Sequence, residues 1–303
     1  MNEYFKQLQQ QFFEYRKAKG FSSNETKPKQ CCMKIFWQYL DKENITDIKA
    51  LKKEHLFNFA TYLTTYKNSS ISSSYQLNIL CLVKSFCKYL LERDIIASDP
   101  SVLVPLPKIG QKLPSNILTV KQMNKLLLSP DINTYIGIRD RAIMELLYTT
   151  AIRNSELRHL KLTDLNLRDG EVFIYQGKGG KDRFVPVGKI AKEFLEIYLD
   201  KARPVLCKQV DNPYVFLSFR GKKLGNNSLQ DLTQRYGKKA GLTGVCPHTF
   251  RHTCATHLLK NKAPIRYIQK LLGHASISST QIYTHVAIED LKEVVRKCHP
   301  REK

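Results

Sequence analysis

The stretch IIASDPSVLVPLPKIGQKLPSNIL, residues 95–118, divides the sequence into two parts. It contains four prolines that would break any helix, at positions 100, 105, 107 and 114. At 303 residues the chain is also longer than one domain usually is, since domains average roughly 100 to 200 residues. We therefore expect two domains, residues 1–105 and 117–303, joined by a linker over 106–116.

The part before the linker predicts a small bundle of four helices. Apolar residues recur at near-helical spacing over 2–19, 25–40, 53–65 and 72–93. Gly20 ends the first of these patterns. Four short helices bury their apolar faces most simply against one another, so this part is expected to be all-helical.

The part after the linker predicts more helices and one small β element. The runs EVFIY (171–175) and DRFVPV (182–187) are rich in β-forming residues, and the glycines of QGKGGK between them can adopt positive φ, so we expect a β-hairpin with a lysine-bearing tip. Thr119 and Gln122 are spaced as a capping box for a helix over 120–128. Further helices are expected at 136–148, 154–161, 189–201, 227–239, 248–260, 264–272, 277–284 and 287–297.

The charge of the chain points to a polyanionic partner. The 49 Lys and Arg residues against 27 Asp and Glu residues give a formal net charge of +22. Both parts are basic, with +6 up to Gly110 and +16 after it. Charge spread over two folded regions favours a protein that surrounds nucleic acid over a membrane-binding tail. The alternative, that the basic residues only maintain solubility, stays open at this point.

Composition also indicates the compartment and the absence of a metal. No segment has about 18 uninterrupted apolar residues, and the N-terminus has no signal-peptide pattern, so we expect a cytoplasmic protein. The eight cysteines form no C-x-x-C pair and are expected to be reduced, buried thiols. Cys246, His248, Cys254 and His257 follow no familiar zinc spacing, so no structural metal is expected.

Four short stretches of the second part carry the chemistry. They are TTAIRNSEL (149–157), QGKGGKDR (176–183), PHTFRHTCATHLL (247–259) and LLGHASISSTQIYTHV (271–286). Their order and spacing resemble the tyrosine recombinase (phage integrase) family, most closely its Xer-type members, and the resemblance extends to the terminal His299-Pro300-Arg301. It implies a mainly α protein with an N-terminal four-helix, SAM-like core-binding domain. The second domain would be a mostly helical catalytic domain with a small β-sheet or hairpin.

The resemblance implies an enzyme that cuts and rejoins duplex DNA at specific sites. Cleavage would proceed through a 3′-phosphotyrosyl intermediate and strand exchange through a Holliday junction, without a cofactor. Attack on a phosphodiester adds negative charge to the non-bridging oxygens, which fixed cations must stabilise. Arg153 and Arg251 suit this task because a guanidinium stays charged and binds two oxygens at once. Taken singly, each arginine would more often be a backbone-phosphate contact or a solvated charge.

The H-x-x-R spacing of His248 and Arg251 places both side chains on one face near the start of a helix. Histidine titrates near neutrality and can take a proton from an attacking phenol or return it. We assign structural or surface roles to the neighbouring histidines, which are His252, His257, His285 and His299.

Tyr283 is the nucleophile that the resemblance implies, nine residues after His274. A phenol with a pKa near 10 needs cations and a base beside it to react, and the plainer alternative is a core or interface tyrosine. His274 would hydrogen-bond the scissile phosphate. Lys178, in the hairpin tip, resembles the lysine that protonates the departing 5′ oxygen, with Lys181 as the alternative. Glu156 matches an acidic position that orients the site, although a helix-surface carboxylate would look the same.

One departure and several alternatives accompany this resemblance. Ala151 stands where the family usually has glycine, which puts the geometry of that turn in doubt. The resemblance implies that the protein binds double-stranded DNA and forms a homo- or hetero-tetramer on two recombination sites. Residues 287–303 would dock on a neighbouring protomer. A partner recombinase or an accessory protein is also implied. Resolution of chromosome or plasmid dimers is the expected role. The alternatives are a mobile-element integrase, a type IB topoisomerase and a catalytically inactive DNA-binding regulator.

Overall fold

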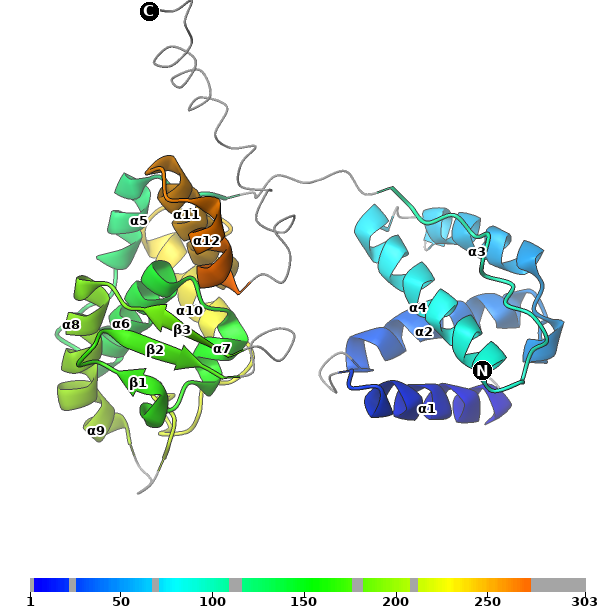
Figure 1. The fold of residues 1–303 in the computed structure, drawn as a ribbon, viewed down its shortest axis with the longest axis horizontal. Coiled ribbons are helices and arrows are strands. Elements are labelled where there is room, and N and C mark those ends of the chain that lie inside the picture. The colour runs from blue at the N-terminus through cyan, green and yellow to red at the C-terminus, as the bar shows by residue number, and fades with distance from the viewer. Residues whose placement is uncertain are drawn as a thin grey trace, which may run out of the picture. The chain divides into compact units, whose positions relative to one another are not determined.

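The computed structural model divides the chain into two compact units, Met1–Gly110 and Gln111–Lys303 (Figure 1). The structure describes residues 3–21, 26–66, 71–108, 116–175, 182–207 and 212–273. Each unit has a hydrophobic core of its own. Within these ranges, no helix is long and apolar enough to span a membrane.

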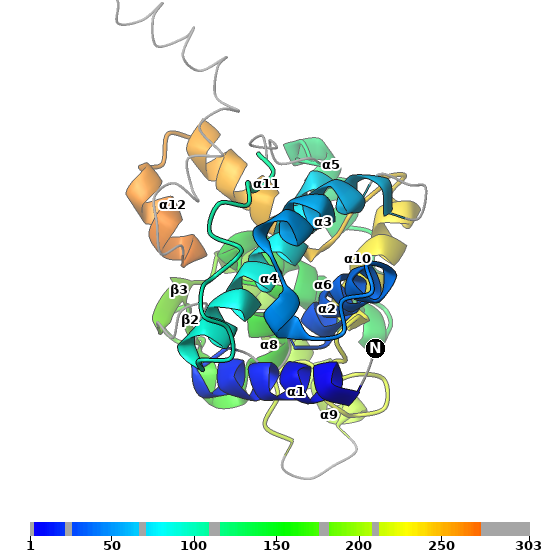
Figure 2. The same ribbon diagram turned by 90° about the vertical axis from the view of Figure 1, so that its right-hand side faces the viewer.

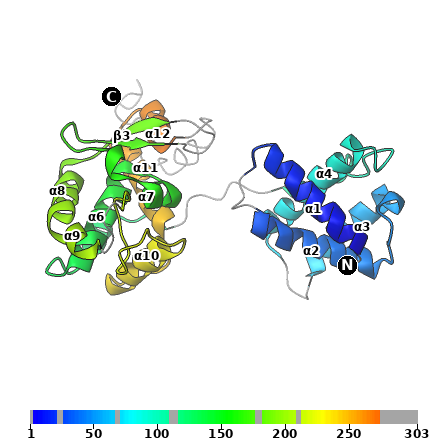
Figure 3. The ribbon, with the colours of Figure 1, turned by 90° about the horizontal axis from the view of Figure 1, so that it is seen from below.

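The first unit is a bundle of four α-helices. They are α1 (Glu3–Ala18), α2 (Thr26–Lys42), α3 (Lys53–Thr65) and α4 (Ser73–Glu92), with a short 3-10 helix, η2 (Ile48–Ala50), between the second and third. Figures 1 and 2 show α1 along one side of the unit and α3 along the opposite side, and α1 lies in front when this unit is seen from below in Figure 3. The expected all-helical bundle is confirmed.

An aromatic cluster forms the centre of this first unit. Trp37 is fully buried, stacks on Phe5 with ring centroids 4.8 Å apart, and meets Phe86 edge-on at 5.4 Å. Its indole Nε1 donates a 2.7 Å hydrogen bond to Oε1 of Gln9. Large rings with a satisfied polar atom explain how a bundle of only four helices acquires a defined core.

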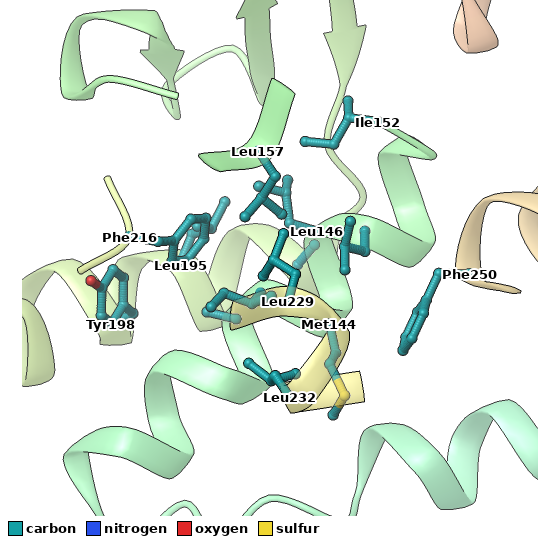
Figure 4. Packing of buried hydrophobic residues seen from close by; sticks show 14 of the residues in the cluster. Met144, Leu146, Ile152, Leu157, Leu195, Tyr198, Phe216, Leu229, Leu232 and Phe250 are labelled. Carbon is teal, nitrogen blue, oxygen red and sulfur yellow. The ribbon is translucent and has the colours of Figure 1, made fainter. Parts of the chain in front are cut away.

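The second unit is built around α6 (Tyr135–Thr150), which is buried along most of its length. The other α-helices are α5 (Val120–Leu127), α7 (Asn154–His159), α8 (Lys189–Ile197), α9 (Arg203–Leu206), α10 (Ser228–Lys239), α11 (Pro247–Lys260) and α12 (Ile265–Leu272). Helix α6 packs against α8 and α11. Figure 4 shows Leu146 and Met144 of this helix among core side chains from the surrounding elements, including Leu157 and Phe250. A helix buried on nearly all sides can hold its two ends at fixed positions.

A small antiparallel sheet completes the second unit. Its strands are β1 (Leu165–Asn166), β2 (Glu171–Ile174) and β3 (Arg183–Pro186), in that order. Val172 pairs with Val185 and Phe173 with Phe184, so the predicted pairing of the two longer runs is confirmed. The two valines are buried, whereas Phe184 is 64% exposed, which identifies the face that covers the core. The sequence analysis predicted only the hairpin of β2 and β3 and did not predict β1. The hairpin tip, residues 176–181, lies outside the described residues.

Other differences from the sequence-based expectations are local. The helix predicted at 189–201 ends at Ile197 and continues as a π-helical turn, η5 (Tyr198–Ala202), and the helix predicted at 154–161 ends at His159. The prediction that the cysteines are buried is wrong for Cys31 and Cys81, which lie on the solvent-facing sides of α2 and α4, and Cys207 and Cys246 are only partly buried. The helices predicted at 277–284 and 287–297 lie outside the described residues.

Candidate active site

The turn between α6 and α7 places the first arginine. Ala151 ends α6 in the left-handed conformation, with φ +50° and ψ +26°, and its N–H donates to the Leu147 carbonyl at 3.1 Å. The chain then turns at Arg153, the residue that precedes α7. Alanine therefore adopts the backbone conformation that usually favours glycine, and the departure at this position leaves the turn intact.

Glu156 holds Arg153 in two ways. The backbone N–H of Arg153 donates to Oε2 of Glu156 at 2.8 Å, and its guanidinium Nη1 donates to Oε1 at 2.7 Å. The first bond caps α7 and the second fixes the direction of the arginine side chain, which is 18% exposed. Glu156 thus orients Arg153, as a residue with a positioning role would.

A second arginine binds the same carboxylate. Arg183, the first residue of β3, donates through Nη1 to Oε1 of Glu156 at 3.0 Å and through Nη2 to Oε2 at 2.9 Å. Burial raises the pKa of Glu156, but hydrogen bonds and positive charge from Arg183 and Arg153 outweigh it and lower the pKa to about 2. Glu156 is therefore ionised at neutral pH, and the three side chains together carry one net positive charge.

Arg251 connects three helices. It lies on α11, is only 4% exposed, and donates through Nη1 to the Ala151 carbonyl and through Nη2 to the Leu272 carbonyl, both at 2.6 Å. These two carbonyls end α6 and α12. Arg251 thus fixes both helix ends relative to α11.

The end of α12 receives a guanidinium at each of three consecutive carbonyls. The pairs are Arg183 Nε with Leu271 O at 3.2 Å, Arg251 Nη2 with Leu272 O at 2.6 Å, and Arg153 Nη2 with Gly273 O at 3.0 Å. The last carbonyls of a helix have no partner within the helix and form the negative end of its dipole, so cations stabilise them. Three arginines from β3, α11 and the α6–α7 turn therefore converge one residue before His274.

His248 lies at the surface in the first turn of α11, three residues before Arg251. Partial desolvation and the positive charges of Arg251 and Arg153 lower its pKa. Its imidazole is therefore neutral at pH 7 and able to accept a proton. The ring of His252 lies 6.1 Å from it, centroid to centroid.

His257 has a structural role, as expected. Its Nε2 lies 2.9 Å from the Leu118 carbonyl and its Nδ1 lies 2.8 Å from the Tyr148 hydroxyl. A carbonyl can only accept, so Nε2 carries the proton and Nδ1 accepts from the tyrosine. The Leu118 N–H in turn donates to Oγ1 of Thr253 at 3.1 Å. Two side chains of α11 therefore hold the chain at Leu118, just before α5 begins.

The structure brings together Arg153, Glu156, Arg251 and, near them, His248, as the sequence predicted. Lys178, His274 and Tyr283 lie outside the described residues, as do Lys181, His285 and His299. Sequence reasoning missed Arg183, although its position offers a signal. It lies two residues before the buried Val185 on β3 and so on the same inward face of the strand, where a charged residue requires a partner. Within the described ranges, no group of three or more metal-ligating side chains is present.

Comparisons with known proteins agree with this architecture. The chain belongs to the phage integrase family, whose sequence profile matches residues 116–290. The tyrosine recombinase XerD of Listeria monocytogenes serotype 4b (strain F2365) is 38% identical over 286 residues, which cover 93% of this chain and 95% of the relative. XerD of Staphylococcus epidermidis strain RP62A is 36% identical over 284 residues, with the same two coverages. Within its family, the chain is therefore an Xer-like tyrosine recombinase, a site-specific DNA-recombining enzyme.

Solved structures of the family share the fold. The crystal structure of XerA recombinase is 27% identical, covers 98% of this chain and 99% of its own, and has a TM-score of 0.53. XerH bound to palindromic difH substrate in a post-cleavage complex is 24% identical, covers 93% and 82%, and has a TM-score of 0.74. The Tn1549 transposon integrase in complex with circular intermediate DNA is 19% identical, covers 91% and 94%, and has a TM-score of 0.70. The expected fold class is confirmed.

Proposed function

We propose that this recombinase cleaves DNA with Tyr283 as the nucleophile and forms a 3′-phosphotyrosyl link while a 5′ hydroxyl departs. The observation that carries this proposal is the convergence of Arg153, Arg183 and Arg251 on the end of α12. Gly273 immediately precedes His274, and Tyr283 follows ten residues after that glycine. The chain that leads to His274 and Tyr283 therefore starts beside three guanidinium groups, and such a cluster of positive charge is where a DNA phosphate would bind.

In this proposal the two arginines of the family motifs stabilise the transition state. Arg153 and Arg251 donate to the non-bridging oxygens, where negative charge grows as the phenol attacks. His248 accepts the phenolic proton, which its lowered pKa favours because the neutral imidazole dominates at pH 7. His274 hydrogen-bonds the same phosphate. Glu156 acts through Arg153 and touches no reacting atom.

Lys178 protonates the departing 5′ oxygen, and a covalent phosphotyrosine conserves the energy of the broken bond. The same hydroxyl, or that of another strand, can then reseal the DNA without ATP or any other cofactor. Two arginines and a lysine supply the charge that nucleases obtain from metal ions. The reaction is therefore expected to proceed in excess EDTA.

The two units divide the work of binding and catalysis. We assign duplex binding to residues 1–105, connection to 106–116 and catalysis to 117–303, with four protomers on two DNA sites. Each protomer would dock residues 287–303 on a neighbour. The partners would include double-stranded DNA and a second recombinase or an accessory protein, in the cytoplasm. Resolution of chromosome or plasmid dimers is the role we propose, because the curated relatives are XerD recombinases.

The test uses a nicked suicide substrate that traps the covalent complex. Tyr283→Phe should bind DNA as the wild type does and form no adduct on a denaturing gel, because only the phenolic oxygen is lost. Tyr267→Phe is the matched control, since Tyr267 is an exposed tyrosine on α12 that has no assigned role. Adduct formation by Tyr283→Phe would identify another nucleophile. Sequencing the DNA trapped from cells would then distinguish a chromosomal site from the ends of a mobile element.

A further inference from the structure

The carboxylate of Glu156 has its full set of hydrogen bonds. A carboxylate offers about four acceptor positions, two on each oxygen. Oε1 accepts from the guanidiniums of Arg153 and Arg183, and Oε2 accepts from the backbone N–H of Arg153 and from Arg183. The single negative charge of Glu156 is therefore shared between two arginines and does not cancel either one.

Arg183 also contacts the end of α12 beside this carboxylate. Its Nε donates to the Leu271 carbonyl at 3.2 Å. Gly273 lies against the plane of the guanidinium, so close that a Cβ atom on this glycine would be 3.0 Å from the Cζ atom of Arg183. The side chain is 9% exposed and fills the space between β3, α7 and α12. One residue thus joins the strand that follows the Lys178 tip, the helix that begins after Arg153, and the helix that ends before His274.

We propose that Arg183 is a positioning residue of the phosphate site, and that it keeps one net positive charge available at Arg153. This inference rests on the proposed function. Without Arg183, Arg153 and Glu156 form a one-to-one ion pair with no net charge, and the anionic phosphate then competes with a carboxylate for the same guanidinium. With Arg183 present, the carboxylate is bound from its other side and Arg153 can bind the phosphate.

The charge balance leads to an experiment that separates this role from a purely structural one. Arg183→Met removes the charge at similar length and makes the cluster neutral. Glu156→Gln, made in addition, removes the carboxylate and restores the native net charge of +1. Arg183→Met should therefore slow single-turnover cleavage about 100-fold at unchanged DNA affinity, and the double variant should recover at least about tenfold of that loss. A structural role predicts that the double variant is no faster than Arg183→Met.

Two further variants complete the design. Arg203→Met removes a guanidinium on α9 that donates to the carbonyls of Asn212 and Tyr214 at 2.6 and 2.9 Å, and it should cleave at the wild-type rate. Arg183→Lys keeps the positive charge but loses the bidentate contact of the guanidinium with Glu156. It should cleave faster than Arg183→Met and slower than the wild type. This variant covers the case in which Arg183→Met does not fold, as circular dichroism would show.

The outcomes distinguish the inference from the proposed function. If the wild type forms no adduct on the suicide substrate, the proposed function fails. If the wild type forms the adduct and a folded Arg183→Met also cleaves at the wild-type rate, Arg183 has no positioning role. A double variant that cleaves no faster than Arg183→Met also overturns the inference. Recovery in the double variant, together with normal cleavage by Arg203→Met, supports it.

Discussion

The carbonyl oxygen of Ala151 accepts a 2.6 Å hydrogen bond from Nη1 of Arg251, and Ala151 itself has left-handed backbone angles. The carbonyl group that accepts this hydrogen bond from Arg251 therefore belongs to a residue under mild backbone strain. Strain of this kind costs roughly 1 to 2 kcal/mol for a residue with a Cβ atom. The strain at Ala151 can be measured by comparing how glycine substitution changes the free energy of unfolding at this position and at a buried alanine within a helix.

Ala151→Gly should change the free energy of unfolding by less than about 0.5 kcal/mol. Relief of the strain offsets the loss of a buried methyl group, about 0.8 kcal/mol, and the greater freedom of the unfolded chain, ~0.4 to 1 kcal/mol. Ala142→Gly is the matched control, because Ala142 is equally buried but lies within α6. It should cost about 2 kcal/mol.

The measurement for this pair is denaturant unfolding followed by far-ultraviolet circular dichroism. Fluorescence of the single tryptophan would not serve, since Trp37 lies in the first unit. Equal losses for Ala151→Gly and Ala142→Gly would contradict the interpretation that residue 151 is strained.

Gly273→Ala should reduce cleavage about tenfold or more, because the added methyl group collides with Arg183 and displaces it from Glu156. Gly20→Ala provides the control, since Gly20 also has positive φ but no atom within 4 Å of the added carbon. Both variants place an alanine at a positive φ and so introduce backbone strain, but only Gly273→Ala brings the new methyl group against Arg183. Single-turnover cleavage on the suicide substrate gives the comparison, and similar rates for the two variants would show that the contact with Arg183 has no catalytic consequence.

The cleavage rate should fall in acid with an apparent pKa below 6.5 and stay flat from neutrality to about pH 8. The sign follows from the pKa of His248, which is lowered, so that the imidazole remains a proton acceptor until the pH drops below the ordinary histidine value. A pH profile of single-turnover cleavage tests this, with DNA affinity measured at each pH. His248→Gln should be slow and should lack the acid limb. An unchanged acid limb in this variant would assign the titration to another group.

Lys178→Ala should cleave a normal phosphodiester slowly and recover on a substrate whose bridging 5′ oxygen is replaced by sulfur. A thiolate leaves without a proton, so the missing acid no longer matters. Lys181→Ala should show neither the defect nor the recovery. Arg153→Ala should stay impaired on both substrates, because a better leaving group does not supply charge to the non-bridging oxygens.

The outcome of the sulfur experiment assigns the acid. Recovery by Lys181→Ala alone would transfer the role to Lys181. Recovery by neither lysine variant would leave the hairpin tip as a DNA-binding element.

Local sequence signals predicted the helices well because their causes are local. The Thr119 hydroxyl accepts from the Gln122 N–H at 3.2 Å, and Oε1 of Gln122 accepts from the Thr119 N–H at 2.9 Å, which is the capping box that the spacing of these two residues predicts. Strand β1 could not be predicted in this way, because two residues carry no periodicity and the strand exists only by pairing with β2.

The site was predictable where a motif names the residue and unpredictable where a long-range contact defines it. Arg153 and Arg251 stand in motifs that can be quoted from the sequence. Arg183 acquires its role only when β3 lies beside Glu156, 27 residues earlier, and Leu271, 88 residues later. Its inward-facing place in the strand signals a buried charge, but nothing in the sequence says which carboxylate that charge meets.

The hydrogen bonds of Leu118 determine where a separately expressed fragment of the second unit must start. Thr253 and His257 bind both polar backbone groups of this residue, and Nδ2 of Asn116 donates to the Gly244 carbonyl at 3.3 Å. A fragment that begins at residue 119 would lack all three hydrogen bonds, and the His257 ring would lose the Leu118 carbonyl that fixes its tautomer. Since α11 also carries His248 and Arg251, residues 116–118, which resemble dispensable connecting chain, belong to the structural support of the proposed active site.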